Sequence, residues 1–559
     1  MPTSTSNVYM ALACLGFLNL ATAASVPSNT HDVLVTLDKG QQLRGVKVNL
    51  GTGEAVNKFY AIPYAKPPTG QLRFEPPAAA LEWTGVKDAK TPGTICHQKP
   101  RAHMEHARSE DCLNLSVFSP NLNTSHPVLV WIHGGGFHEG SQYGDGSGAT
   151  LTRFGLVVIM INYRLSPFGF LSTGDDVMPG NYGMLDQVMA LKWVRKYIHF
   201  FGGDPAQVTI AGESAGSHSV AFQILSPLSK GLFHRAIMES GSSLSSSACE
   251  KPGTLVKVKD FTRAIATSIG CGTANSSALL HCLKLVDAGR LLNASDAAEQ
   301  KFGISFIGIP RVERKFGFLP DHPKNMISSG HFNNVDTLRG FNTGEWAFVI
   351  HDTANDGVTR QEFTRYFREY FRKSSFVNDD AIERLVERAY LVNETDPVKI
   401  RKSLVDALAD LTYGGAALLE LEKTAEAAGL TTQHYFYEFS YRANNTATPQ
   451  WMGVAHAAER QFVFFDPTSA ARTNTDKAVG AEVQRMWTNF VKFGNPTPTG
   501  SGDGAAHWDR FTPTNKAMML IGAHPVLEKV PRPFVIPLYE QVLHLMHEVN
   551  AVTTDPVIG

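Results

Sequence analysis

A serine lies at the centre of a glycine-flanked motif near the middle of the chain. Residues 207–217 carry a short β-branched run that leads directly into Gly-x-Ser-x-Gly around Ser214. A strand that turns sharply into a helix crowds its corner, and Gly212 and Gly216 relieve that crowding, so the serine hydroxyl can stand exposed. The motif is short and common, and an ordinary glycine-rich turn is the alternative interpretation. The preceding strand favours a nucleophile.

Three consecutive glycines follow an apolar run upstream. Residues 128–137 read as a buried strand that ends in His-Gly-Gly-Gly-Phe. Acyl transfer passes through a tetrahedral intermediate whose oxygen is negatively charged, and backbone N–H groups without bulky side chains can approach it closely. We therefore expect an oxyanion hole formed by the N–H groups of Gly135, Gly136 and Ala215. A phosphate-binding loop is the alternative, but its Gly-x-x-x-x-Gly-Lys pattern is missing here.

Five further segments strengthen this interpretation. They are residues 59–65, 109–115, 162–165, 180–187 and 201–205. Together with the two motifs above they follow one order along nearly the whole mature chain, which in these residues resembles the type-B carboxylesterase and cholinesterase family. The resemblance implies an α/β-hydrolase fold, with a large central, mostly parallel twisted sheet flanked by helices and carrying helical insertions.

The nucleophile needs a base, and the base needs an orienting carboxylate. In α/β-hydrolases the chain order is serine, acid, histidine. Residues 340–345 resemble the acid loop of the family and residues 453–459 resemble its histidine loop. The resemblance therefore implies a triad of Ser214, Glu345 and His456.

Other residues compete for these roles. Asp336 and Asp352 lie near enough in sequence to replace the acid, and His133 and His434 are alternatives for the base. His133 adjoins the glycine run, so we expect it to order that loop. Ser240 matches a family position where a hydroxyl supports the acid or base, and a turn serine without such a role is the alternative.

The implied reaction requires no metal or organic cofactor. Ser214 attacks an ester carbonyl as His456 takes its proton, Glu345 orients the imidazole, and an acyl-enzyme forms when the alcohol leaves. Water activated by His456 then releases the acid. Activity should fall on the acid side as His456 protonates, with an imidazole pKa of about 6.5 if it is unperturbed.

Composition favours one large domain at residues 24–559. The 559 residues are 43% hydrophobic, and neither an internal repeat nor a low-complexity linker interrupts them. The formal net charge is −1, with dispersed lysine and arginine, which argues against nucleic acid as a partner because such proteins present a basic face. Small-molecule esters are the expected partners.

The amino terminus predicts a signal peptide at residues 1–23. Met10–Leu20 is apolar but too short to span a bilayer, and Ala21–Ala23 has the small residues of a cleavage site. The segment before it has no lysine or arginine, which departs from the usual pattern, and a short membrane anchor is the alternative. The carboxyl terminus carries no hydrophobic tail, so we expect a secreted protein without a membrane span.

Cysteines and glycosylation sequons agree with export. The family resemblance implies the disulfides Cys96–Cys112 and Cys271–Cys282, which leaves Cys249 as an expected buried thiol, with pairing between chains as the alternative. Five Asn-x-Ser/Thr sequons are glycosylation candidates: Asn123, Asn275, Asn293, Asn393 and Asn444. The sixth, at Asn114, is expected to be buried in a strand. An apolar stripe near the carboxyl terminus suits packing on the body or dimerisation, so we expect a monomer or a homodimer.

The first disulfide loop limits the range of expected substrates. Cholinesterases bind choline through a tryptophan there, but the loop from Cys96 to Cys112 contains histidine and arginine and no tryptophan. Phe302, Ile304 and Phe306 fall near the acyl pocket of relatives. We therefore expect a broad carboxylic ester hydrolase that is not selective for acetylcholine. The alternatives are a slow-turnover protein that sequesters esters and a non-catalytic cholinesterase-like binding protein.

Overall fold

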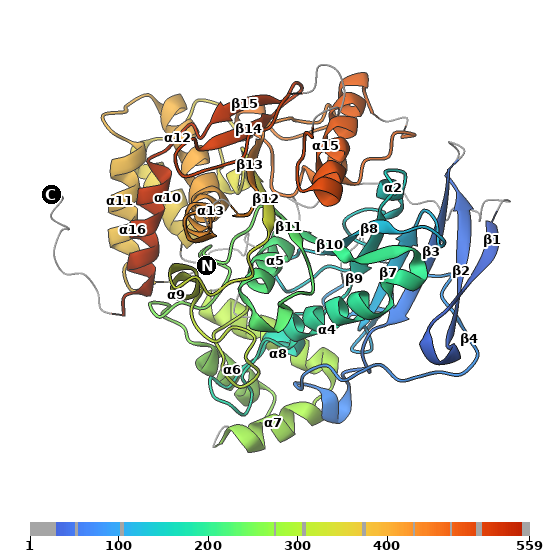
Figure 1. The fold of residues 1–559 in the computed structure, drawn as a ribbon. Helices are drawn as coiled ribbons and strands as arrows, with labels where there is room; N and C mark the ends of the chain where they lie inside the picture. Colours follow the sequence, from blue (N-terminus) through green and yellow to red (C-terminus); the bar gives the residue numbers. More distant parts are fainter. Residues whose placement is uncertain are drawn as a thin grey trace.

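A thirteen-stranded sheet forms the body of the protein (Figure 1). The computed structural model describes residues 30–50, 54–100, 105–272, 275–303, 309–371, 376–428, 431–469, 472–498 and 506–549, so the predicted signal peptide lies outside the described residues. The strands of the sheet are β1 (Thr30–Thr36), β2 (Gln42–Asn49), β3 (Ala55–Pro63), β4 (Val86–Asp88), β7 (Asn114–Ser119), β8 (His126–Ile132), β9 (Val157–Ile161), β10 (Gly203–Glu213), β11 (Arg235–Glu239), β12 (Asp336–Asn342), β13 (His434–Phe439), β14 (Ala517–Ile521) and β15 (Val526–Lys529).

The strand order is β1-β2-β3-β7-β9-β8-β10-β11-β12-β13-β14-β15, and β4 pairs with β2. From β9 to β14 every neighbouring pair is parallel. The pairs between β1 and β9 along this order and the pair β14–β15 are antiparallel, and β4 pairs parallel with β2. Parallel neighbours require crossover connections, which the helices supply. The predicted α/β fold with a large, mostly parallel central sheet is therefore confirmed.

Helices cover both faces of this sheet (Figure 1). They are α2 (Ala149–Thr152), α3 (Ser166–Phe170), α4 (Tyr182–Tyr197), α5 (Ala215–Leu225), α6 (Val258–Ser268), α7 (Ser276–Leu285), α8 (Ala288–Phe302), α9 (Pro323–Ser328), α10 (Arg360–Phe371), α11 (Asp379–Tyr390), α12 (Pro397–Ala409), α13 (Gly415–Ala428), α14 (Arg460–Val463), α15 (Asn474–Phe493) and α16 (Val535–His547). Among the described residues, no helix combines the length and apolarity needed to cross a bilayer.

Strand β8 shows how the two faces are filled. Val128, Val130 and Ile132 pack in the core cluster that includes α4, α5 and α16, whereas Leu129 and Trp131 pack in the cluster that includes α2 and α15. Successive side chains of a strand point to opposite faces. A strand covered on both faces is apolar throughout, which explains the continuous apolar run before the three glycines.

The register of the parallel strands aligns their carboxyl ends. Gly212 at the end of β10 pairs with Ile132 of β8, and Glu213 pairs with Glu239 at the end of β11. Glu239 in turn pairs with Gly340 of β12. The loops that leave these strands therefore start side by side at one edge of the sheet, where ligands of open α/β sheets bind.

Candidate active site

Ser214 lies at the corner between β10 and α5. The strand ends directly before it, the helix begins directly after it, and its own backbone has φ 56° and ψ −123°. A Cβ on Gly216 would lie 2.0 Å from the carbonyl oxygen of Ile132, so this corner has no room for a larger residue. Ser214 is partly exposed, whereas the other residues of 211–220 are buried. The packed corner therefore leaves this serine accessible.

The glycine loop after β8 passes beside the serine. A Cβ on Gly134 would lie 3.2 Å from the Cβ of Ser214. Gly135 and Gly136 have φ values of 100° and 61°. A residue with a side chain would be strained in this backbone conformation. Ala215 is the first residue of α5, and the first N–H groups of a helix have no partner within it. The loop and the helix start thus bring backbone donors to the neighbourhood of Ser214.

Glu345 contacts His456. Its Oε2 atom lies 2.7 Å from the Nδ1 atom of the imidazole. The Oε1 atom accepts hydrogen bonds from the Ser240 hydroxyl at 2.5 Å and from the backbone N–H of Asn342 at 3.0 Å. Because Glu345 is fully buried, these donors fix the direction in which its carboxylate points.

Hydrogen bonds tie the acid loop to the histidine loop. The Gly344 N–H donates to the Val454 carbonyl at 2.9 Å, and the Val454 N–H donates to the Thr343 hydroxyl at 3.0 Å. The Asn342 side chain donates to the Ala455 carbonyl at 2.9 Å. These bonds explain how two segments more than 100 residues apart in sequence hold an acid and an imidazole together.

The second nitrogen of His456 faces Glu213 rather than Ser214. Its Nε2 atom lies 3.2 Å from Oε1 of Glu213 and 3.5 Å from the Tyr413 hydroxyl. Both Ser214 and His456 belong to the described residues, and no hydrogen bond joins them. The structure thus places the expected acid beside the base and shows no hydrogen bond between the base and the serine.

The two carboxylates change the proton affinity of His456. Burial lowers the pKa of this imidazole, but the negative charges of Glu345 and Glu213 outweigh burial and raise the pKa to about 9. Burial also raises the pKa of Glu213, against the opposing effect of His456 and Arg460. His456 therefore holds a proton more tightly than an exposed imidazole does.

Further buried acids adjoin Glu213. Glu239 and Glu459 are fully buried; the Trp487 indole N–H donates to Glu239 at 2.7 Å, and the Asn342 amide donates to Glu459. Burial and the neighbouring carboxylates raise the pKa of Glu239 well above its usual range and that of Glu459 to about 8. Sequence reasoning missed this group and the Glu213–His456 contact. Strand register aligns Glu213 with Glu239, and the histidine loop brings His456 and Glu459 to them from a distant part of the chain.

The competing acids lie in other ion pairs. Asp336 is 3.8 Å from Arg235 and accepts a hydrogen bond from the backbone N–H of Gln433 at 2.8 Å. Asp352 pairs with Arg401. Neither carboxylate contacts His456 in the described part of the chain, so Glu345 is the acid that the structure places beside the base.

The competing histidines are held by other partners. The ring of His133 stacks on Tyr163 with centroids 4.5 Å apart, and its Nδ1 atom lies 2.8 Å from the Gly134 carbonyl oxygen. The ring nitrogens of His434 contact the hydroxyls of Thr337 and Thr432. His133 therefore packs within the glycine loop, as expected from its position in sequence.

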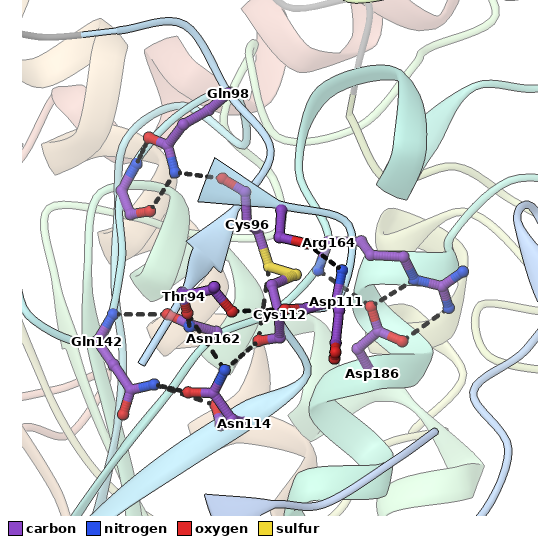
Figure 2. The surroundings of a disulfide bond; sticks show 12 residues. Thr94, Cys96, Gln98, Asp111, Cys112, Asn114, Gln142, Asn162, Arg164 and Asp186 are labelled. Atoms are coloured by element: carbon purple, nitrogen blue, oxygen red, sulfur yellow. Dashed lines mark hydrogen bonds and ion pairs between the residues drawn. A yellow bond between two sulfur atoms is a disulfide. The ribbon is translucent and has the colours of Figure 1, made fainter. Parts of the chain in front are cut away.

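The loop closed by the first disulfide is hydrogen-bonded to the segment that follows the glycines. Figure 2 shows Cys96 bonded to Cys112, with Gln98 nearby. The Gln98 amide donates to the Gly140 carbonyl at 2.8 Å, and its oxygen accepts from the Gly140 N–H at 2.9 Å. This paired contact fixes the far end of the glycine loop.

The remaining cysteines match the expected pattern. Cys271 and Cys282 form the second disulfide, and Cys249 is a buried free thiol. Burial raises the pKa of the Cys249 thiol to about 11. This thiol therefore stays protonated at neutral pH.

The expected acyl pocket is only partly described. Phe302 ends α8 and its ring centroid lies 6.3 Å from that of Phe261 on α6. Ile304 and Phe306 lie outside the described residues. The assignment of these three residues to an acyl pocket therefore stays a prediction.

Comparison with known proteins agrees with this geometry. The model of the carboxylesterase family matches residues 31–533. Carboxylesterase 1F of Mus musculus is 33% identical over 534 residues, which cover 90% of this chain and 92% of the relative. Cocaine esterase of Oryctolagus cuniculus is 34% identical over 520 residues, which cover 88% of this chain and 91% of the relative. The chain therefore belongs to the carboxylesterase family and is a carboxylic ester hydrolase.

Proposed function

We propose that the chain hydrolyses esters through an acyl-enzyme on Ser214. The observation that carries this proposal is the 2.7 Å contact between Glu345 and His456, at the sheet edge where Ser214 lies partly exposed at its corner. A serine hydroxyl becomes nucleophilic when an oriented imidazole removes its proton. In this proposal His456 is the general base and Glu345 orients it.

The reaction requires a small movement of the imidazole. On substrate binding, Nε2 of His456 leaves Glu213 and contacts Ser214; catalytic hydrogen bonds are often long without substrate and tighten in the complex. Ser214 Oγ then bonds to the carbonyl carbon, and the N–H groups of Gly135, Gly136 and Ala215 stabilise the oxyanion.

His456 completes both half-reactions. It donates the proton taken from Ser214 to the leaving alcohol, which breaks the ester C–O bond and leaves the acyl-enzyme. It next removes a proton from water, which attacks the acyl carbonyl, and returns that proton to Ser214 as the acid leaves. Ser240 supports this cycle through its hydrogen bond to Glu345.

The proposed substrates are neutral esters with apolar acyl or alkyl groups. The loop between Cys96 and Cys112 lacks a tryptophan for a choline cation. Lys99 of this loop pairs with Asp296 on α8. Phe302, Ile304 and Phe306 are the proposed acyl-pocket residues.

We further propose that the protein is secreted, as a monomer or homodimer. The signal-peptide pattern at residues 1–23 and the two disulfides support export, because disulfides persist in oxidising compartments.

The test is hydrolysis of p-nitrophenyl acetate, butyrate and octanoate, with the acyl-enzyme detected by intact mass. Ser214→Ala should abolish both turnover and the acyl adduct. Ser217→Ala is the matched control, because this buried hydroxyl of the same helix donates to the Gly241 carbonyl at 3.2 Å. The control should keep its activity.

Each outcome decides between functions. Serine-dependent turnover with a transient adduct supports the proposal. The relative rates for the three acyl-chain lengths indicate how long an acyl group the pocket accepts. One equivalent of product followed by very slow turnover would instead indicate a sequestering protein. Equal rates for acetylthiocholine and its uncharged carbon analogue support the neutral-ester class, whereas a strong preference for the cation contradicts it.

A further inference from the structure

Tyr413 lies against the face of His456. The two rings are nearly parallel, with an interplanar angle of 7° and centroids 5.0 Å apart. Tyr413 is buried, and its hydroxyl oxygen is 3.5 Å from Nε2 of the imidazole. A hydrogen bond of that length is weak, so the ring face makes the larger contact.

His456 needs such a contact because its own backbone lies in a loop. One hydrogen bond at Nδ1 leaves an imidazole free to pivot about that bond, and Nε2 already has an alternative partner in Glu213 at 3.2 Å. A parallel ring against the face of the imidazole prevents it from tilting while permitting movement in its own plane. Movement in this plane allows Nε2 to leave Glu213 while Nδ1 stays beside Glu345.

Tyr413 is presented by a π-helical turn. The helix formed by α12 and α13 widens at Asp410–Gly414, and the Gly415 N–H donates to the Asp410 carbonyl five residues earlier. One extra residue in a helix rotates the side chains that follow by roughly 100° relative to those before it. The insertion therefore determines which way Tyr413 faces.

Neighbouring elements hold this turn. The Asp410 carboxylate accepts hydrogen bonds from the Tyr390 hydroxyl at 2.8 Å and from Arg532 at 2.6 and 3.0 Å. A Cβ on Gly414 would lie 2.9 Å from the ring of Phe341, a β12 residue four positions before Glu345. The turn is thus packed against the strand that positions Glu345.

A column of rings continues beyond Tyr413. The ring of His218, four residues after Ser214, lies 5.9 Å from that of Tyr413 and 6.4 Å from that of Phe137. Phe137 directly follows the glycines of the expected oxyanion loop. The column therefore connects that loop to the base through side-chain packing.

We propose that Tyr413 is a positioning residue that restrains the imidazole of His456 to the plane in which it moves between Glu213 and Ser214. This inference rests on the proposed acyl transfer at Ser214. It assigns the effect to the ring of Tyr413, with a minor contribution from the hydroxyl.

The test compares two substitutions at one position. Tyr413→Leu removes the ring face and should lower kcat for p-nitrophenyl butyrate by about 100-fold, the scale of a misplaced catalytic group, with KM changed by less than about threefold. Tyr413→Phe keeps the ring and should stay within about threefold of the natural protein, because the 3.5 Å hydroxyl contact is weak. Tyr435→Leu is the matched control, since Tyr435 is buried on β13 against Phe490 and Trp508.

A second readout does not depend on turnover. The proton between Nδ1 of His456 and Glu345 should give a low-field proton resonance, identified by its loss in His456→Ala. Tyr413→Leu should broaden or abolish this resonance, and Tyr413→Phe should retain it. Tyr413→Met replaces the leucine variant if that variant does not fold, because it fills volume without presenting a ring.

The outcomes separate this inference from the proposed function. Loss of kcat and of the resonance in Tyr413→Leu, with recovery in Tyr413→Phe, supports positioning. An unchanged kcat and resonance in Tyr413→Leu overturns it while Ser214-dependent turnover stands. If the natural protein forms no acyl adduct, the proposed function fails, and the resonance alone decides whether Tyr413 restrains the imidazole.

Discussion

His456 has a carboxylate at each ring nitrogen. Glu345 lies 2.7 Å from Nδ1 and Glu213 lies 3.2 Å from Nε2. A general base works only when it is neutral. Burial lowers the pKa of His456, but the two carboxylates raise it to about 9, so the acid limb of activity should lie above the ordinary imidazole pKa of about 6.5. The sequence-based expectation of an unperturbed value did not include Glu213.

Glu213→Gln tests this effect. It removes one negative charge beside Nε2, so the pKa of His456 should fall and the midpoint of the acid limb of kcat/KM should move to lower pH. The measurement is the pH profile for a neutral ester between pH 5 and about 10, a range that spans the ordinary and raised values. Glu528→Gln, on the exposed part of β15, is the control. An unmoved midpoint would contradict the role of Glu213.

Ser240→Ala should weaken catalysis without removing it. The Ser240 hydroxyl is one of three donors to the buried Glu345 carboxylate. A hydrogen bond to a charged group contributes about 1.5 to 3 kcal/mol, so kcat should fall by about tenfold or more while KM changes little. Steady-state kinetics of this variant, with Ser217→Ala as the control, would check this. A kcat equal to that of the unsubstituted protein would show that the remaining two donors suffice.

At the scale of elements, the glycine loop depends on its anchor to the first disulfide loop. Gln98 makes two hydrogen bonds to Gly140 and a third to the Cys96 carbonyl. Gln98→Ala should reduce stability by about 2 kcal/mol and lower kcat more than it raises KM, because the expected oxyanion donors lose their support. Thermal unfolding and kinetics measure these effects.

The control for Gln98→Ala is Gln207→Ala. Gln207 lies in β10 ahead of its buried end, and its amide bonds to Asp204 at 2.9 Å, away from the glycine loop. If both variants lose kcat equally, the hydrogen bonds from Gln98 to Gly140 have no specific role in positioning the glycine loop.

Sequence reasoning predicted elements whose signals are local. The apolar run of β8 and the glycine corner at Ser214 are visible in residues close together in the chain, and the acid and histidine loops each carry a short pattern of their own. The Glu213–His456 contact depends on how distant segments meet at the sheet edge. The π turn that presents Tyr413 depends on its packing against Phe341 and on the hydrogen bonds that Asp410 receives from other helices and loops. Neither has a periodicity or motif that a single sequence displays.

At the scale of the whole molecule, the sequons divide by exposure. The five candidates Asn123, Asn275, Asn293, Asn393 and Asn444 are exposed. Asn114 is buried, and its amide nitrogen donates to the carbonyls of Cys112 and Thr94 at 3.1 and 3.2 Å (Figure 2). Glycosylation uses this nitrogen, so we expect glycans only among the exposed five.

Peptide mapping of the expressed protein before and after enzymatic deglycosylation would check this expectation. Each glycosylated asparagine becomes aspartate on release of its glycan, which marks the site by mass. A glycan on the Asn114 peptide would contradict the buried arrangement, and a protein that carries none and remains inside the cell would contradict secretion.

The order of the site along the chain has a consequence for biosynthesis. The glycine loop, Ser214, Glu345 and His456 leave the ribosome in that sequence, and the serine and its expected base are more than 200 residues apart. Domains begin to fold while synthesis continues, so the nucleophile exists in a nascent chain long before its activator. A serine-directed covalent probe should therefore ignore stalled chains that end before the histidine loop and label only nearly complete ones. Reactivity at Ser214 would then report that the histidine loop has folded into place, and an incomplete chain would not react with the probe.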